Sequence, residues 1–527
     1  MAKKTCVLII LDGWGIGHKD DSNAIYRSKT PTIDYIKKNY PTASLQSAGI
    51  AVGLPWDEAG NSEVGHLTLG AGRVIYQHYP RISLAVRNGD FFKNQALNEA
   101  FNHGINNDSS VHILGLLSSG NIHSSYEHLQ ALIKLASLKK CSKLFLHLFT
   151  DGKDSGLQSA KGMVEKLQND LKKFSVGELA SLTGRYYALD RRKNWAITQK
   201  YYNLITKGEG RKAPDPIALL NDYYAKKMSD PFVEPTLIFN PDKSKAPHLI
   251  QDNDSIIFLD FREDSIKQIA APFAAKDFKD FERTPLNNLR VTTMTNYDDA
   301  FNANVAFPPE KVNNGITEIL SNLEMQQLKI AETEKFYHLT YFFNCLTDKI
   351  FPNEFRVLIP SKETVHVDDS PEMRAPEITD RLVTALNEGI YDFIVVNYAN
   401  PDVIAHTGNY NATIKAIEIV DGQLSKVLDA AKKSQTSIII TADHGNAEKL
   451  YDPITGEKET EHNPNPVPFY LISEKFKLKK EKLEPQITAE ENKTLGVLCD
   501  VAPTILELME IPPPPEMKGR SLLQYLK

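Results

Sequence analysis

The chain has 527 residues, 41% hydrophobic and 24% charged, a composition typical of globular proteins with about two to four domains. Its formal net charge of −6 gives no indication of nucleic-acid binding, and no apolar run approaches the roughly 18 residues of a membrane span. The four cysteines (Cys6, Cys141, Cys345 and Cys499) form no C-x-x-C pair, which argues against a zinc ribbon or a disulfide framework. The first apolar run, near the N-terminus, is too short for a signal peptide, so we expect a cytoplasmic protein without membrane or nucleic-acid partners.

Short apolar runs that end in polar residues alternate along the chain with segments of helical periodicity. The runs are VLIIL at 7–11, VHILGLL at 111–117, KLFLHLFT at 143–150, ELASLTG at 178–184, SIIFLDF at 255–261, DFIVVNY at 392–398 and SIIITA at 437–442. Continuous runs of this kind predict strands covered on both faces, hence an α/β fold of mostly parallel sheets flanked by helices. Two helices are predicted between them: one after Thr30 as N-cap with Pro31 first, and one over 162–174. Ligands of such sheets bind beyond the carboxyl ends of the strands, which is where the polar residues lie.

Ser62 lies in the glycine-rich stretch EAGNSEVGHLTLGAG at 58–72. The stretch is not a nucleophile elbow, because Gly65 follows the serine by three residues rather than two. It is not a phosphate-binding P-loop either, because His66 stands where that motif needs lysine. Taken alone, the stretch favours turn glycines and a serine that caps a helix. A catalytic role for Ser62 depends on the rest of the chain.

Carboxylates and imidazoles gather at the two ends of the chain, at the ends of predicted strands. They are Asp12, Asp402, His406, Asp443, His444 and His462. In NYANPDVIAHTG, Asn400 is expected to cap a helix that places Asp402 and His406 one turn apart, as a metal pair or as a helix-terminal carboxylate and a packed imidazole. Asp443 and His444 directly follow a buried strand, which favours metal ligation over packing.

The donor set as a whole predicts a pair of divalent metal ions. Mixed oxygen and nitrogen donors suit Mn²⁺ or Zn²⁺, and the lack of thiolates argues against a structural zinc site. Two ions about 4 Å apart can clamp the attacking and leaving oxygens of a phosphoryl transfer. Metal coordination would also lower the pKa of the Ser62 hydroxyl and make it a nucleophile.

Cations dominate the middle of the chain and predict a binding site for a small polyanion. The candidates are His123, Lys153, Asp154, Arg185, Arg191 and Arg262, with Lys335 just beyond them. Asp154 is a candidate general acid or base toward a substrate hydroxyl, or a turn residue. This segregation predicts a domain at 77–311 inserted into a discontinuous domain formed by 1–76 and 312–527, with seams near 77–90 and 305–315.

Ten motifs in order resemble the cofactor-independent (2,3-bisphosphoglycerate-independent) phosphoglycerate mutases of the alkaline phosphatase superfamily, over essentially the whole chain. They are LDGWG, GNSEVGH with LGAGRVIYQ, GNIHSS, TDGKDS, GRYYALDR, AETEKF, NYANPDVIAHTG, TADHGNAE, NPVP and DVAPT. The resemblance implies an alkaline-phosphatase-like outer domain and an inserted substrate-binding, or transferase, domain. It also implies a glycolytic and gluconeogenic enzyme that interconverts 3-phosphoglycerate and 2-phosphoglycerate through phosphoserine on Ser62, without bisphosphoglycerate. Manganese is the expected metal, with Mg²⁺, Co²⁺ and Zn²⁺ as the alternatives. The expected oligomeric state is a monomer.

The resemblance also assigns roles to individual residues. One metal is held by Asp402, His406 and His462, and the other by Asp12, Asp443 and His444, with the Ser62 oxygen as a further ligand. Lys335 stabilises the serine oxygen and the transferring phosphoryl group. The glycerate is held by His123, Lys153, Asp154, Arg185, Arg191 and Arg262, with Asp154 as the proton shuttle. Closure of the two domains is expected to exclude water from phosphoserine.

Two positions depart from the family pattern. Lys153 replaces the arginine of the usual Gly-Arg-Asp, and Ser265 stands where the family usually has a second arginine three residues after Arg262. Both changes remove guanidinium groups and therefore leave two alternatives open. One is a phosphatase or another phosphomutase of the same superfamily. The other is a non-catalytic binder of phosphorylated metabolites, which would have no need of a nucleophile.

Overall fold

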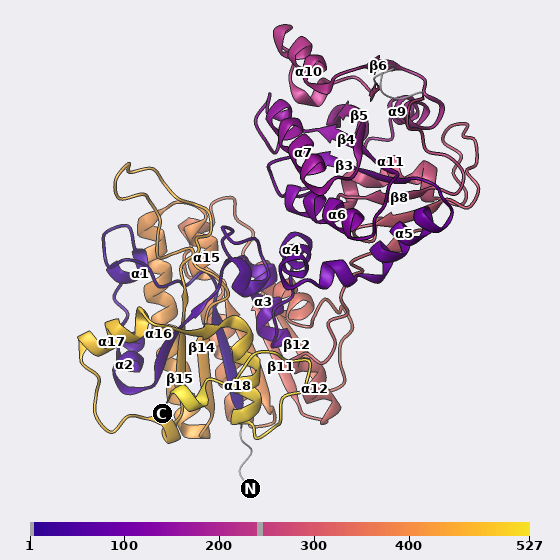
Figure 1. Cartoon of the computed structure of the whole chain (residues 1–527). Coiled ribbons are helices and arrows are strands. Elements are labelled where there is room, and N and C mark those ends of the chain that lie inside the picture. The colour runs from indigo at the N-terminus through magenta and orange to yellow at the C-terminus, as the bar shows by residue number, and fades with distance from the viewer. Residues whose placement is uncertain (1–4, 240–245, 527) are drawn as a thin grey trace. The chain divides into compact units, whose positions relative to one another are not determined.

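The computed structural model describes residues 5–239 and 246–526, which form two compact units (Figure 1). The first unit combines the residues up to Gln77 with those from Lys311 onward, and the second is His78–Glu310. None of the helices in the described ranges has the length and apolar character needed to cross a membrane.

The first unit contains an eight-stranded sheet. In spatial order its strands are β12 (Glu354–Ile359), β11 (Gln327–Glu332), β13 (Phe393–Tyr398), β1 (Cys6–Leu11), β14 (Ser437–Thr441), β15 (Val467–Ile472), β2 (Thr42–Gln46) and β16 (Thr494–Val497). All neighbours are parallel except β15, which runs antiparallel to both β14 and β2. Every residue of β1 is fully buried, as expected for a central strand between layers of helices.

Ten α-helices are described in this unit. They are α1 (Ala24–Arg27), α2 (Pro31–Asn39), α3 (Ser62–Ala71), α12 (Ile316–Asn322), α13 (Thr333–Tyr337), α14 (Ala375–Glu388), α15 (Asn400–Ala405), α16 (Tyr410–Ser434), α17 (Glu484–Glu491) and α18 (Val501–Leu508). Thr30 is the N-cap of α2 and Pro31 its first residue, as predicted, although the Thr30 side chain makes no capping hydrogen bond. The expected cap at Asn400 is wrong. Asn400 lies inside α15 and donates to the carbonyls of Pro371 and Glu372, because its amide is buried between those turns.

The second unit contains another eight-stranded sheet. Its spatial order is β10 (Asn304–Val305), β9 (Arg290–Thr293), β8 (Ser255–Phe258), β3 (Val111–Leu117), β4 (Leu144–Thr150), β5 (Glu178–Gly184), β7 (Thr236–Ile238) and β6 (Arg211–Ala213), with β7 antiparallel to β5. Its helices are α4 (His78–Asn88), α5 (Gln95–Asn106), α6 (Tyr126–Leu138), α7 (Ala160–Phe174), α8 (Arg185–Ala188), α9 (Trp195–Lys207), α10 (Pro216–Ala225) and α11 (Glu263–Ala274). Ile113 and Leu114 of β3 belong to separate hydrophobic clusters, so apolar layers cover both faces. The predicted α/β fold with two mostly parallel sheets is confirmed.

Candidate active site

Ser62 is the first residue of α3 and is 5% exposed, so it lies neither in a loose loop nor at the capping position. Asn61 is the N-cap, and its side chain accepts a hydrogen bond from the Val64 N–H at 3.0 Å. A Cβ atom at Gly65 would come within 2.6 Å of the Asp443 carbonyl oxygen. The glycine therefore serves close packing of α3 against the loop that follows β14.

Three groups converge on the Ser62 hydroxyl. Lys335 Nζ lies 2.7 Å from Ser62 Oγ, His444 Nε2 lies 2.9 Å away and Asp12 Oδ1 lies 3.3 Å away. These residues follow the carboxyl ends of β11, β14 and β1, which are near neighbours in the sheet. The strand-end positions of the sequence motifs thus meet around one serine oxygen.

Two clusters of potential metal ligands lie at this edge of the sheet. One contains Asp12, Asp443 and His444, and the other contains Asp402, His406 and His462; within each, the ligand atoms lie within 4.8 Å of one another. Asp402 Oδ1 is 3.3 Å from Nε2 of His406 and 3.3 Å from Nε2 of His462. All six residues of the predicted metal set are therefore brought together.

The hydrogen bonds of the histidines orient the same nitrogen of each toward the ligand clusters. Nδ1 of His406 lies 2.7 Å from the Thr460 carbonyl, Nδ1 of His462 lies 2.9 Å from the Gly60 carbonyl, and Nδ1 of His444 lies 3.3 Å from the Gly445 carbonyl. A carbonyl only accepts, so each neutral ring carries its proton on Nδ1 and presents the Nε2 lone pair.

This arrangement fits divalent cations. Nε2 of His406 and Nε2 of His462 approach to 3.0 Å, so two lone pairs face each other unless a cation lies between or beside them. Asp443 Oδ2 is buried, with His66 Nδ1 at 3.1 Å and His444 Nε2 at 3.5 Å as its neighbours. Carboxylate oxygens and imidazole nitrogens without thiolates match manganese- or zinc-type sites.

Lys335 supplies the positive charge of the cluster. Its Nζ lies 2.7 Å from Asp12 Oδ1 and 2.7 Å from Asp402 Oδ2, so it bridges the two ligand groups. Although burial opposes it, these carboxylates raise the pKa of Lys335 well above its usual value. Burial likewise lowers the pKa of His444, but the Asp443 and Asp12 carboxylates outweigh it and raise that pKa to about 9.

Three further side chains hold the ligand carboxylates and were not predicted. Asn397 donates to Asp12 Oδ2 at 2.7 Å, and Asn446 donates to Asp402 Oδ1 at 2.8 Å. His66 Nδ1 lies 3.1 Å from Asp443 Oδ2 and 2.8 Å from the Ser62 carbonyl. All three stand inside quoted motifs: His66 in GNSEVGH, Asn397 as the first residue of NYANPDVIAHTG, and Asn446 in TADHGNAE. Membership of these motifs was the available signal.

Glu448 ties together the loops that carry these ligands, and it too was not predicted. Its buried carboxylate accepts the Gly15 N–H at 3.1 Å, the Asn446 N–H at 2.9 Å and the Asn465 side chain at 3.1 Å. A Cβ at Gly15 would lie 2.1 Å from Glu448 Cδ, and one at Gly445 would lie 2.3 Å from Oε1. Both glycines are therefore required for the close approach of backbone and carboxylate.

The second unit brings together three of the residues predicted to bind a polyanion: His123, Asp154 and Arg185. Arg185, the first residue of α8, donates to Asp151 and, at 2.9 Å, to Asp154 Oδ2. Arg185 Nη2 lies 2.9 Å from Nε2 of His123, which is 6% exposed. These residues follow β4, β5 and β3, again at the carboxyl ends of adjacent strands.

The remaining predicted cations lie toward solvent. Arg191 and Arg262 share the Asp264 carboxylate, with Arg262 Nε 3.0 Å from Asp264 Oδ1. Lys153 is exposed, and only its backbone N–H is bonded in this region, to Asp151 at 3.2 Å. Lys335 lies in the first unit, beside Ser62.

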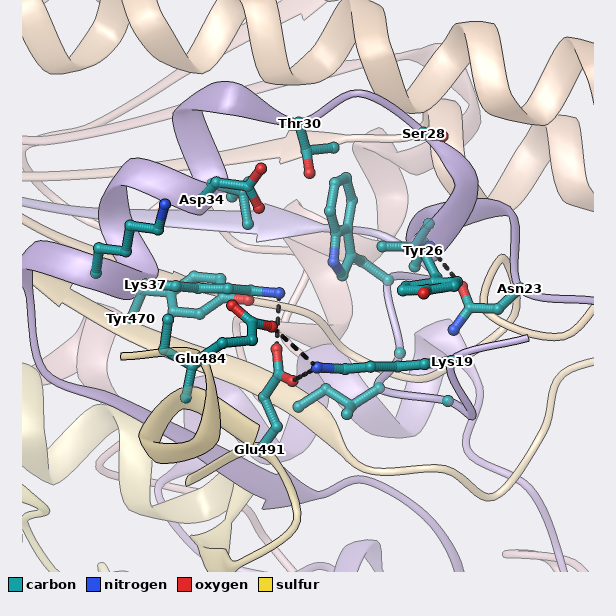
Figure 2. A pocket seen from close by; sticks show the side chains of 18 residues that line it. Lys19, Asn23, Tyr26, Ser28, Thr30, Asp34, Lys37, Tyr470, Glu484 and Glu491 are labelled. Atoms are coloured by element: carbon teal, nitrogen blue, oxygen red, sulfur yellow. Dashed lines mark hydrogen bonds and ion pairs between the residues drawn. The ribbon is translucent and has the colours of Figure 1, made fainter. Parts of the chain in front are cut away.

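A cavity of about 310 Å³ lies beside the segment after β1 (Figure 2). Its cations and anions pair with each other: Lys37 Nζ lies 2.7 Å from Glu491 Oε1, and Lys19 Nζ lies 3.3 Å from Glu484 Oε1. None of the predicted site residues lines it, and its charges are mutually neutralised. The chemistry of the molecule is concentrated at the strand ends rather than in this cavity.

The profile of the Metalloenzyme superfamily matches residues 4–513. A 2,3-bisphosphoglycerate-independent phosphoglycerate mutase of Clostridium botulinum is 43% identical over 525 residues, which cover 99% of this chain and 100% of that protein. The enzyme of the same name from Francisella philomiragia is 41% identical over 526 residues, 100% of both chains. This chain belongs to the 2,3-bisphosphoglycerate-independent phosphoglycerate mutase family.

A crystal structure of Leishmania mexicana phosphoglycerate mutase at low cobalt concentration aligns with a TM-score of 0.51 and 26% identity, covering 99% of this chain and 98% of that one. Membership makes the protein a metalloenzyme of the isomerase class.

Proposed function

We propose that the protein interconverts 3-phosphoglycerate and 2-phosphoglycerate through a phosphoserine on Ser62, without bisphosphoglycerate. The observation that carries this proposal is the buried Ser62 Oγ, with an ammonium at 2.7 Å and an imidazole nitrogen at 2.9 Å beside two ligand clusters. The full-length relatives named 2,3-bisphosphoglycerate-independent phosphoglycerate mutase support phosphoglycerate as the substrate. Manganese is the proposed metal, and we place the enzyme in the cytoplasm, in glycolysis and gluconeogenesis, as a monomer.

Different residues of the chain would hold the metals and stabilise the charge on the serine oxygen. Asp402, His406 and His462 would hold one divalent ion, and Asp12, Asp443, His444 and the Ser62 oxygen would hold the other. Bound metal supplies Lewis acidity that lowers the pKa of the serine hydroxyl and neutralises charge on the phosphoryl oxygens. Lys335 keeps a positive charge 2.7 Å from Ser62 Oγ, where negative charge develops during attack on phosphorus.

The second unit would bind the glycerate as a domain at 78–310, with the first unit as the metal-binding domain. Arg185, Arg191, Arg262 and Lys153 would hold its phosphate and carboxylate, as guanidinium groups do through paired donors. Asp154 would move the proton between the two glycerate hydroxyls, because its Oδ2 contacts both Arg185 Nη1 and His123 Nε2. The Ser62 phosphoryl group then passes to the other hydroxyl of the same glycerate.

Phosphorus NMR of the manganese-loaded protein with 3-phosphoglycerate, and no bisphosphoglycerate, tests the proposal. We expect 2-phosphoglycerate to accumulate without free phosphate. Ser62→Ala should abolish this conversion. Ser44→Ala is the matched control: it removes a buried hydroxyl of the same unit that has no hydrogen-bond partner among the described residues. Release of inorganic phosphate alone would indicate a phosphatase. An unchanged spectrum would show that 3-phosphoglycerate is not a substrate.

A further inference from the structure

Ser265 bonds the imidazole of His123. It lies in the first turn of α11, is 3% exposed, and its Oγ is 2.8 Å from His123 Nδ1. The same hydroxyl lies 3.0 Å from the Arg262 carbonyl oxygen. Both ring nitrogens of His123 are thus engaged, because Arg185 Nη2 lies 2.9 Å from Nε2.

The direction of each hydrogen bond in this chain follows from the partners. A guanidinium only donates, so Nε2 of His123 accepts from Arg185 and carries no proton. The neutral ring therefore carries its proton on Nδ1 and donates it to Ser265 Oγ. The Ser265 hydroxyl in turn donates to the Arg262 carbonyl, which only accepts. No other assignment satisfies all three contacts.

The surroundings keep the ring neutral. Burial is the main cause that lowers the pKa of His123, and the Arg185 cation adds to it, giving a value of about 4. The Asp154 carboxylate, 3.4 Å from Nε2, acts in the opposite direction but does not outweigh them. At neutral pH the ring thus has one donor and one acceptor, and their placement decides what His123 can bind.

We propose that Ser265 is a positioning residue that holds His123 as the Nδ1–H tautomer, so that Nε2 remains an acceptor for a substrate hydroxyl. This rests on the proposed function, in which a phosphorylated hydroxy acid takes the Arg185 contacts and leaves Nε2 free. An arginine at 265 has only donors and could not accept from Nδ1–H. The serine therefore sets a tautomer that an arginine at this position could not support in this way.

Nitrogen-15 NMR of histidine-labelled full-length protein, without substrate, tests the tautomer directly. The His123→Gln spectrum identifies the His123 signals. We expect a protonated Nδ1 and an unprotonated Nε2 in the wild type. Because Arg185 also requires an unprotonated Nε2, the Ser265 variants are compared in an Arg185→Met background. In that background Ser265 should still hold Nδ1–H, whereas Ser265→Ala and Ser265→Arg should shift the population toward Nε2–H, which can donate to Asp154. Ser265→Thr keeps a hydroxyl and should retain the wild-type tautomer.

Kinetics then connect the tautomer to turnover. Loss of one hydrogen bond that orients a substrate contact should lower kcat/KM of Ser265→Ala by about two- to tenfold, and Ser265→Thr should restore most of it. Circular dichroism and Mn²⁺ titration of each variant check that fold and metal binding are intact. If His123 of the wild type carries its proton on Nε2, or if Ser265→Ala leaves the tautomer unchanged in the Arg185→Met background, the proposal is wrong. If the tautomer behaves as expected but the wild type has no mutase activity, the proposed function fails while the positioning role of Ser265 stands.

Discussion

At the scale of single residues, the site depends on Lys335. One ammonium lies 2.7 Å from Ser62 Oγ, from Asp12 Oδ1 and from Asp402 Oδ2. It therefore neutralises two buried carboxylates before any metal binds and also stands where the serine oxygen becomes charged. A buried charge that loses its partner is strongly destabilising, whereas a cation from solution can replace that partner.

Lys335→Met should lower the free energy of unfolding of the metal-free protein by about 3–5 kcal/mol, and Mn²⁺ should restore part of the loss. Urea unfolding with and without Mn²⁺ measures both effects. Lys329→Met is the matched control, because Lys329 is equally buried and lies 3.3 Å from Glu354, outside the ligand clusters. Its loss of stability should not respond to Mn²⁺; an equal response of both variants would contradict the role of Lys335.

At the scale of elements, the ligands stand on the segments that follow β1, β13 and β14 and precede β15, with Asp402 in α15. The segments after β1 and β14 and before β15 share one anchor. Glu448 provides it through the Gly15 N–H, the Asn446 N–H and the Asn465 side chain. Residues that orient metal ligands without touching the ion typically change affinity by about 10–100-fold when removed. The glycines at 15 and 445 allow this anchor to sit close to the backbone.

Glu448→Gln should weaken Mn²⁺ binding by about 10–100-fold, because an amide nitrogen replaces an oxygen that accepts from these loops. Calorimetric titration of the metal-free protein with Mn²⁺ gives the dissociation constant. Asp421→Asn is the control, since Asp421 is a buried carboxylate that accepts the Thr32 and Ile33 N–H groups at the start of α2. That variant should lose stability but keep its metal affinity. An unchanged affinity in Glu448→Gln would exclude the anchoring role.

At the scale of the whole molecule, the two units have separate cores. Each cluster of buried apolar side chains among the described residues draws its members from one unit. The candidate metal ligands all belong to the first unit, and His123, Asp154 and Arg185 belong to the second. Ligands of the two kinds should therefore stabilise different parts of the chain.

Calorimetric unfolding should show two transitions, of which Mn²⁺ raises only one. At a free Mn²⁺ concentration of 100 times the dissociation constant, the stabilisation is about 2.7 kcal/mol. A chelator should reverse the shift, and Asp402→Asn should reduce it, while 3-phosphoglycerate acts on the other transition. A single transition that moves with both ligands would show that the units unfold together.

The sequence determined the parallel strands and the chemistry at their ends. Continuous apolar runs predicted β1, β3, β4, β5, β13 and β14 to within one residue at each end, because strands buried on both faces are mostly apolar. A few buried polar residues, such as His112 of β3 and Asn397 of β13, interrupt them. The run at 255–261 was too long, since β8 ends at Phe258. The runs also placed Asp12, Asp402 and Asp443 just beyond strand ends, which a parallel sheet brings to one edge.

Only the tertiary structure decided the rest. Val467–Ile472 contains Pro468 and was not among the predicted strands, yet it forms β15, antiparallel to β14 and β2, which are distant from it in sequence. Ser62 was expected among turn glycines, but it begins a helix, and Gly60, Gly65 and Gly70 serve close packing. Gly72 alone of the four adopts a left-handed conformation, at the end of α3. The roles of Asn397, Glu448 and Ser265 could not be predicted, because each depends on a hydrogen bond to a residue at least 142 positions away. Periodicity records which side chains are buried, whereas the identity of a buried polar group's partner is fixed only when the chain has folded.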